Sequence, residues 1–133
     1  MLLFSSFYTS KGSLTVRITG LRNNQGHVLI SLFKEGMGYP DKPEKAYRKE
    51  QLSISSNASV AVFGNIPPGD YAIAILHDEN DDLKMNKNWL GLPKEGYGFS
   101  NNVMGTFGPP SYNKAKFTCH TDQPVSLEIK ILY

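Results

Sequence analysis

Short segments in which apolar and polar residues alternate recur along this chain. In residues 14–19, LTVRIT, every second residue is apolar, and the segment 27–34, HVLISLFK, follows after a turn rich in asparagine and glycine. A period of two buries one face of a strand and leaves the other in solvent. We therefore predict a strand at each segment, joined as a hairpin through the turn 21–26.

Five more segments are predicted as strands: residues 46–54, 58–63, 71–76, 115–119 and 125–132. The first has no clear period and is predicted as a polar edge strand. Residues 71–76, YAIAIL, are the least polar and suit a strand buried on both faces. The loop 35–45, with its glycines and prolines, has room for a short helical turn. Short strands separated by frequent turns are typical of two-sheet proteins. We predict an all-β fold, an antiparallel seven-stranded immunoglobulin-like or prealbumin-like β-sandwich.

The composition fits one domain. The chain has 133 residues, of which 40% are hydrophobic, so it can bury a core without metal or disulfide support. We assign residues 12–133 to this domain and residues 1–11 to a leader remnant or a flexible N-terminus.

The single cysteine, Cys119, excludes an internal disulfide and is predicted to be a small buried residue. A net charge of +2 gives no sign of nucleic-acid binding, and no apolar run is long enough for a membrane span.

Residues 77–112 form a long stretch without a comparable strand pattern. Compact domains rarely keep such a loop without a use for it. We predict one long ordered loop that carries the functional surface, with an unknown protein or a glycan as its partner. The surface residues expected from the sequence are His77, Trp89, Glu95, Tyr97, Phe99, Asn101, Asn102 and Tyr112.

The start of this loop places oxygen ligands at alternate positions, as calcium loops do. The candidate metal ligands are Asp78, Asn80, Asp82, the carbonyl of Lys84, Asn86 and a distal carboxylate, Glu95. The match is partial, because Leu83 stands where such loops carry glycine and Trp89 where they carry a bidentate acid. The alternative is a solvated acidic turn whose side chains cap their own backbone.

Two other functions remain open. A hydrolase could use His77 with Asp78 or Glu95 as acid or base. No nucleophile motif accompanies these residues, so no catalytic residue is assigned and the chain is expected not to be an enzyme. A carbohydrate-binding module could stack sugar rings on Trp89 and Tyr97. The alternative for the loop aromatics is a small core that anchors the loop to the sandwich.

Three runs in the second half of the chain, GDYAIAILHDEN, LGLPKEGYGFSNN and FGPPSY, resemble the bacterial family called domain of unknown function 2141. Members of that family usually look exported, so the resemblance implies a periplasmic or secreted protein. The family's loop typically reads DENxNGxLDxN. Here Leu83 replaces its glycine and Asn86 its second aspartate, which weakens the calcium pattern. The sequence as a whole favours a non-enzymatic exported binding module in which calcium can brace the long loop.

Overall fold

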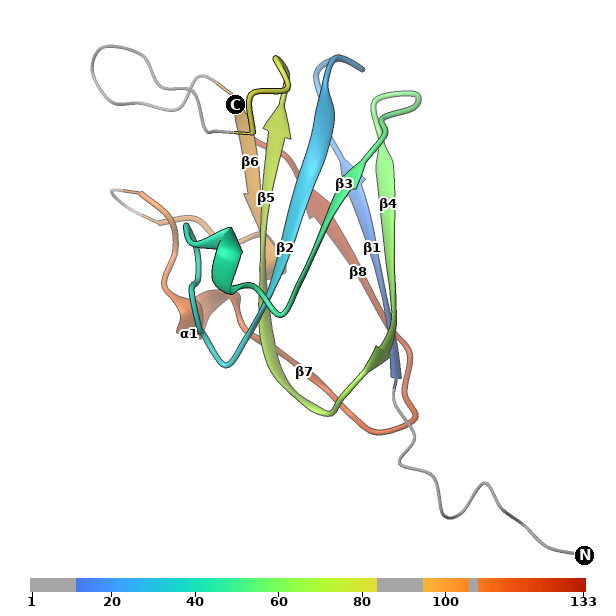
Figure 1. Ribbon diagram of the computed structural model, residues 1–133, viewed down its shortest axis with the longest axis vertical. Coiled ribbons are helices and arrows are strands. Elements are labelled where there is room, and N and C mark those ends of the chain that lie inside the picture. Colours follow the sequence, from blue (N-terminus) through green and yellow to red (C-terminus); the bar gives the residue numbers. More distant parts are fainter. Residues whose placement is uncertain (1–11, 84–94, 106–107) are drawn as a thin grey trace, which may run out of the picture.

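The computed structural model describes residues 12–83, 95–105 and 108–133. Within them the fold is all-β, with eight strands in two sheets and a few short helical turns (Figure 1). The strands are β1 (Gly12–Thr19), β2 (His27–Lys34), β3 (Arg48–Leu52), β4 (Ser59–Ile66), β5 (Gly69–Asp78), β6 (Gly96–Phe99), β7 (Phe117–Cys119) and β8 (Val125–Lys130). The helical elements are α1 (Tyr112–Ala115) and two 3-10 turns, Pro43–Lys45 and Ser100–Asn102.

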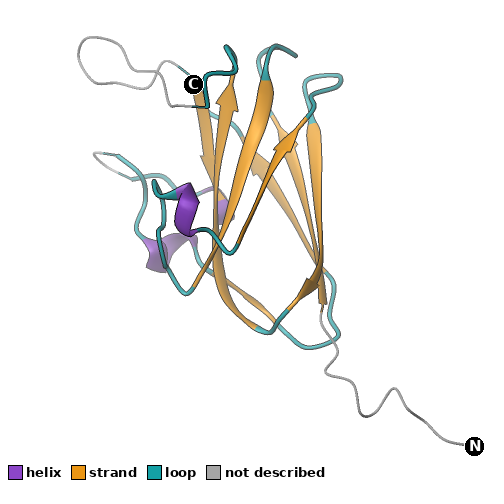
Figure 2. Cartoon of the chain, in the orientation of Figure 1, coloured by secondary structure: helices purple, strands orange, loops and turns teal. Residues whose placement is uncertain are grey.

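The two sheets have different sizes and share one core. One sheet has the order β4-β1-β8, and the other has the order β3-β2-β5-β6 with β7 also pairing with β5. The helical segments gather beside the larger sheet (Figure 2). Every second residue of β1, beginning with Leu14, is fully buried in a cluster that takes side chains from both sheets. The apolar alternation therefore faces the space between the sheets, as the sequence predicts.

Strand β5 is buried on both faces, as predicted. Tyr71, Ala72 and Ile73 are consecutive and all fully buried. Tyr71 and Ile73 belong to the core between the sheets, whereas the α1 and Ser100–Asn102 segments contact β5 from outside. Cys119 is also buried in the core, in the reduced form. The edge strand predicted near residues 46–54 and the short turn predicted in residues 35–45 are both present, as β3 and Pro43–Lys45.

The predicted hairpin between the first two strands is wrong. β1 pairs with β4 and β8, and β2 pairs with β3 and β5, so the turn after β1 carries the chain from one sheet to the other. The pairing of β1 with β8 is parallel, which also corrects the prediction of a wholly antiparallel fold. The alternation of apolar and polar residues in a strand shows which side chains are buried, but it does not show which other strands pair with that strand.

The described residues hold eight strands rather than seven, because β6 lies inside the predicted long loop. Its residues on the core side are Gly96 and Gly98, which have no side chain to produce an apolar alternation. A Cβ atom on Gly96 would lie 2.4 Å from Cγ2 of Ile131, and one on Gly98 would lie 3.0 Å from Cγ2 of Ile129. The C-terminal segment packs so closely here that only glycine fits.

No helix in the part of the chain that the structure describes has the length and apolar character needed to cross a membrane.

Candidate functional site

His77 is at the centre of a hydrogen-bonded network at the end of β5. Its side chain is fully buried, with Nδ1 2.7 Å from the hydroxyl of Tyr133 and Nε2 2.7 Å from the backbone carbonyl of Gln25. Because a carbonyl only accepts, Nε2 carries a hydrogen, and Nδ1 accepts from the Tyr133 hydroxyl in the neutral ring. That hydroxyl in turn accepts the backbone N–H of Arg22 at 3.0 Å. Both ring nitrogens are thus used within the fold, an arrangement that does not favour the hydrolase interpretation.

Arg22 connects this network to the turn after β5. Its guanidinium donates to the carboxylate of Glu79 and lies 4.5 Å from the centroid of the Tyr133 ring. Asn23 donates to the same carboxylate at 2.7 Å. The bonds from Arg22, and then that from Asn23, lower the pKa of Glu79, against the opposing effect of burial. Glu79 is therefore held by the 21–26 turn as an anion.

Three carboxylates meet beside this network. Asp78, Asp82 and Glu95 each place an oxygen so that these atoms lie within 4.8 Å of one another. Asp78 is fully buried and Glu95 is 4% exposed, whereas Asp82 is exposed. Two of the three carboxylates have thus been removed from water and lie next to a third.

Backbone amides orient this acidic cluster. The N–H groups of Leu83 and Asp82 donate to Asp78 at 2.7 and 3.3 Å, and that of Glu79 donates to Glu95 at 2.7 Å. The turn needs positive φ at Leu83, 63°, the position where calcium loops carry glycine. Burial raises the pKa of Asp78; the Leu83 N–H opposes the rise and the charge of Glu95 adds to it.

Several predicted metal ligands can be placed and others cannot. Asp78, Asp82 and Glu95 come together, although Glu95 is distant in sequence from the other two. Asn80 is exposed, and its Oδ1 accepts the N–H of Asp82 at 3.2 Å, as expected for a self-capping turn. Lys84, Asn86 and Trp89 lie outside the described residues.

The run Ser100–Asn102, which the sequence analysis assigned in part to a partner surface, joins separate elements of the fold. Ser100 is fully buried. Its Oγ accepts the N–H of Ile73 and donates to the carbonyl of Ala115. Ile73 lies between the part of β5 that pairs with β6 and the part that pairs with β7. Asn101 donates to the carbonyls at the end of α1, those of Lys114 and Lys116.

Asn102 pairs with the open edge of β8. Its amide nitrogen donates to the carbonyl of Glu128 at 3.0 Å, and its Oδ1 accepts the N–H of Lys130 at 2.9 Å. The side chain thus makes the two bonds that a neighbouring strand would make. Asn101 and Asn102 are exposed, but their amide groups act on the backbone of this chain.

The aromatic residues that the structure describes in this region form a small core outside the larger sheet. Phe99 is 7% exposed, and Tyr97 and Tyr112 are half-buried. Ring contacts join Tyr39 to Phe33, Phe99 and Tyr112 at centroid distances of 5.8, 6.3 and 5.9 Å, and Tyr97 to Phe99 at 5.9 Å. This packing supports the anchoring interpretation for these rings. The sugar-stacking prediction needs Trp89, whose position is not described.

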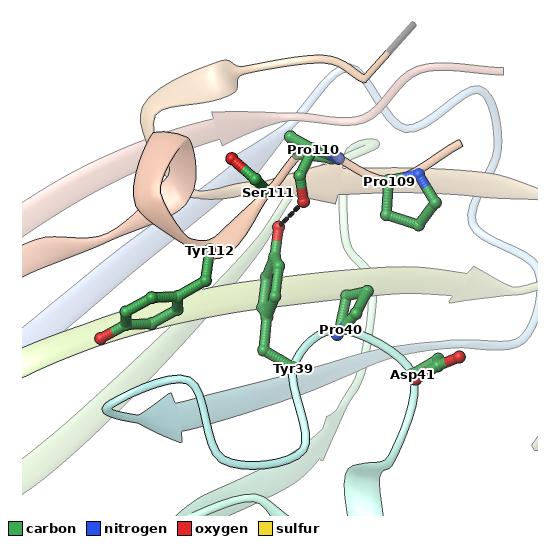
Figure 3. Close-up of a pocket in the computed structure, with 7 residues that line it drawn as sticks. All are labelled: Tyr39, Pro40, Asp41, Pro109, Pro110, Ser111 and Tyr112. Atoms are coloured by element: carbon green, nitrogen blue, oxygen red, sulfur yellow. Dashed lines mark hydrogen bonds between the residues drawn. The ribbon is translucent and has the colours of Figure 1, made fainter. Parts of the chain in front are cut away.

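An open hollow of about 340 Å³ lies next to these rings. Its lining residues are Tyr39, Pro40, Asp41, Pro109, Pro110, Ser111 and Tyr112. Figure 3 shows the Tyr39 ring between Tyr112 and Pro40, with its hydroxyl bonded to the carbonyl of Pro110 at 2.8 Å. Of the predicted surface residues that the structure describes, only Tyr112 lines this hollow.

Sequence reasoning missed Arg22, Gln25 and Tyr133, which hold His77 and Glu79 in place. The segment 21–26 has the composition of an ordinary turn, and Tyr133 is 56 positions from His77 along the chain. In the sequence, Ser100 is simply a serine within the predicted long loop, with no visible partner. No local pattern indicates these contacts, because each one joins segments that are distant in the sequence.

No curated protein and no solved structure matches this chain. A family model described as an uncharacterized protein conserved in bacteria, DUF2141, matches residues 16–127. This span runs from β1 into β8 and includes the acidic cluster, so it covers both the core and the candidate site. The resemblance seen in the sequence is confirmed: the chain belongs to the DUF2141 family of bacterial proteins.

Proposed function

We propose that this protein is a non-enzymatic, exported binding module whose acidic cluster binds calcium and thereby braces the 77–112 segment. The observation that carries the proposal is the meeting of Asp78, Asp82 and Glu95 within 4.8 Å, two of them buried. An immunoglobulin-like or prealbumin-like sandwich remains the finer fold assignment, supported by two sheets around one core. A periplasmic or secreted location rests on the family resemblance.

Calcium fits the chemistry of the cluster. Ca²⁺ takes about six to eight oxygen ligands and tolerates irregular geometry, so three carboxylates can supply part of its shell and carbonyls or water the rest. Burial disfavours the charged form of Asp78, and the neighbouring carboxylates repel one another. A divalent cation would offset both costs, and it would join the end of β5 to Glu95 just before β6.

The test is calcium titration of the purified protein, followed by calorimetry and by thermal melting in calcium and in chelator. We expect a saturable heat and a higher melting temperature in calcium. Asp78→Asn and Glu95→Gln should abolish the calcium-dependent rise, even if either variant melts lower in chelator. Asp41→Asn, which changes an exposed carboxylate at the hollow, is the matched control. An unchanged melting temperature at millimolar calcium would remove the metal from the proposal.

The partner of the module is proposed to be a protein or a glycan that contacts the 77–112 segment. The long connection between β5 and β6, residues 79–95, supports this assignment, because connections of that length usually serve a function. A glycan array and cross-linking in bacterial envelope extracts would test it. A glycan hit that survives Tyr97→Ala would contradict the alternative in which a sugar ring stacks on Tyr97.

A further inference from the structure

One edge of β4 is open only in its middle: Ser55 pairs with Ala58 just before the strand, and Arg48 of β3 donates to the carbonyls of Gly64 and Asn65 near its end. Among the described residues β4 is the outermost strand of the three-stranded sheet and pairs only with β1 (Figure 1). The N–H of Ile131 donates to the carbonyl of Thr19, so Thr19 and every second residue before it in β1 direct their backbone groups toward β8. The intervening residues of β1, such as Val16, therefore bond to β4.

This alternation fixes the direction of the β4 backbone groups. Val16 is opposite Ala61, so the N–H and C=O of Ala61 point toward β1. Those of its neighbours Val60 and Val62 point the other way, toward the free edge. The carbonyl of Gly64 agrees with this pattern, because it accepts from Arg48 of β3 on that side. Two donors and two acceptors are thus presented in a row at the middle of the edge.

The side chains leave this edge unprotected. Edge strands usually carry charges or proline that prevent pairing with other chains. The sequence of β4, SVAVFGNI, has neither, and Val60 and Val62 are 49% and 61% exposed. The edge strand of the other sheet, β3, has the sequence RKEQL, in which three of five residues are charged. β3 thus carries charges of its own and β4 carries none, and Arg48 of β3 reaches the β4 edge only at Gly64 and Asn65.

We propose that β4 is a homodimerisation edge, on which a second copy of this chain pairs antiparallel across a twofold axis. The register centred on Ala61 uses only the open groups of Val60 and Val62, because Ala58 already pairs with Ser55 and the carbonyl of Gly64 already accepts from Arg48. With Ala61 opposite the partner's Ala61, Val60 is opposite the partner's Val62, and Val62 is opposite the partner's Val60. Both members of each valine pair direct their backbone groups outward, so the two pairs close four hydrogen bonds.

The same register brings favourable side chains together. β-Branched pairs on neighbouring strands stabilise a sheet, whereas like charges directly opposite each other destabilise it. No charge lies on β4 to repel its own copy. The nearest charged pair on the same face, Arg17 with Glu128 at 3.6 Å, balances itself within one chain. The result is a continuous six-stranded sheet through two copies.

Pairing over so short a segment buries less area than a standard interface of about 1,600 Å², so a weak dimer is expected. Sedimentation velocity from about 10 µM to about 1 mM covers the range of such affinities. The measurements are made in chelator, so that they do not depend on calcium binding. We expect the mean mass to rise from monomer toward dimer, and a protein that stays monomeric throughout overturns the proposal.

Substitutions at the edge locate the interface. Val62→Lys should raise the dissociation constant at least about tenfold, because it places like charges across the twofold axis. Val62→Thr keeps a β-branched, uncharged residue and should still dimerise. Ser126→Lys adds the same charge on the exposed face of β8 and should also dimerise. Dimerisation that survives Val62→Lys with the fold intact by circular dichroism would place the contact elsewhere and refute the proposal.

Amide exchange followed by NMR tests the register itself. The N–H groups of Val60 and Val62 should become protected as concentration rises, whereas that of Ala61 is already bonded to β1 and should not change. A concentration-dependent dimer without this alternation would contradict β4 pairing.

Discussion

The hydroxyl of Tyr133 lies 2.7 Å from Nδ1 of His77, and this contact ties the C-terminal segment to the end of β5. The same hydroxyl accepts the backbone N–H of Arg22, so one side chain joins three segments of the chain. The ring also contacts the arginine guanidinium through its face. His77 is a candidate acid or base in the sequence, but in the structure both of its ring nitrogens are hydrogen-bonded within the fold.

Tyr133→Phe should therefore lower the free energy of unfolding by about 1–3 kcal/mol, because it leaves a buried ring nitrogen and a backbone N–H without their partner. Urea denaturation at neutral pH measures the loss. Tyr47→Phe is the control, because Tyr47 is about as exposed as Tyr133, 41% against 45%, but its hydroxyl is not part of this network. A cost for Tyr133→Phe no larger than that of the control would show that the network contributes little.

Ser100→Ala should cost about 1–3 kcal/mol of unfolding free energy, since it removes one oxygen that serves both the N–H of Ile73 and the carbonyl of Ala115. Chemical denaturation compares it with Ser111→Ala, in which the exposed serine before α1 makes no capping bond from its side chain. Equal stabilities of the two variants would contradict the bridging role.

Gly96→Ala should destabilise the protein by about 1–3 kcal/mol, because the added methyl would overlap Ile131 and the Tyr133 ring, 2.4 and 2.5 Å from the new carbon. Gly64→Ala provides the matched control: it is also a strand glycine, but nothing lies within 4 Å of the position that its Cβ would take. That variant should change the unfolding free energy by less than about 0.5 kcal/mol. Thermal melting of both proteins distinguishes close packing from a general preference for glycine.

The pH dependence of stability should separate Asp78 from Glu79. Burial raises the pKa of Asp78 in the folded state, so the protonated acid is favoured there. Its contribution to stability is complete below the ordinary aspartate pKa of about 4 and is lost as pH rises through the raised value. In chelator, the cost of Asp78→Asn should therefore be larger at low pH and should decrease as pH rises.

Glu79 should behave in the opposite way. Hydrogen bonds from Arg22 lower its pKa, so its contribution is present above the ordinary glutamate pKa of about 4.3 and is lost as pH falls through the lowered value. Urea titrations of Glu79→Gln across the acidic range should show a cost that disappears at low pH. Parallel pH profiles for the two variants would contradict the opposite pKa shifts.

The strands were predictable from the sequence wherever one face is apolar. β1, β2 and β5 carry this signal because their core residues are large and regularly spaced. β6 carries none, because its core positions are Gly96 and Gly98, and the reason for those glycines lies in the close approach of Ile129 and Ile131. Strand pairing was not predictable either, since the periodicity of β1 is the same whichever neighbours it has.

The acidic cluster was only partly predictable. Asp78 and Asp82 lie in one turn, where alternate oxygens converge, and Glu95 was selected as a distal carboxylate because the local pattern lacked its final acid. Asn101 and Asn102 were predicted as partner residues because they lie in the long segment 77–112, which is predicted as the functional surface. Their bonds to Lys114 and Glu128 depend on the tertiary fold, which no local pattern encodes.

The parallel pairing of β1 with β8 has a consequence for biosynthesis. β1 is the middle strand of its sheet, yet Leu14 meets Val125, a residue made 111 positions later. A ribosome adds about 5–20 residues each second, so several seconds of synthesis separate β1 from this partner. The smaller sheet can therefore be completed only when β8 is available, and until then β1 presents a second open edge.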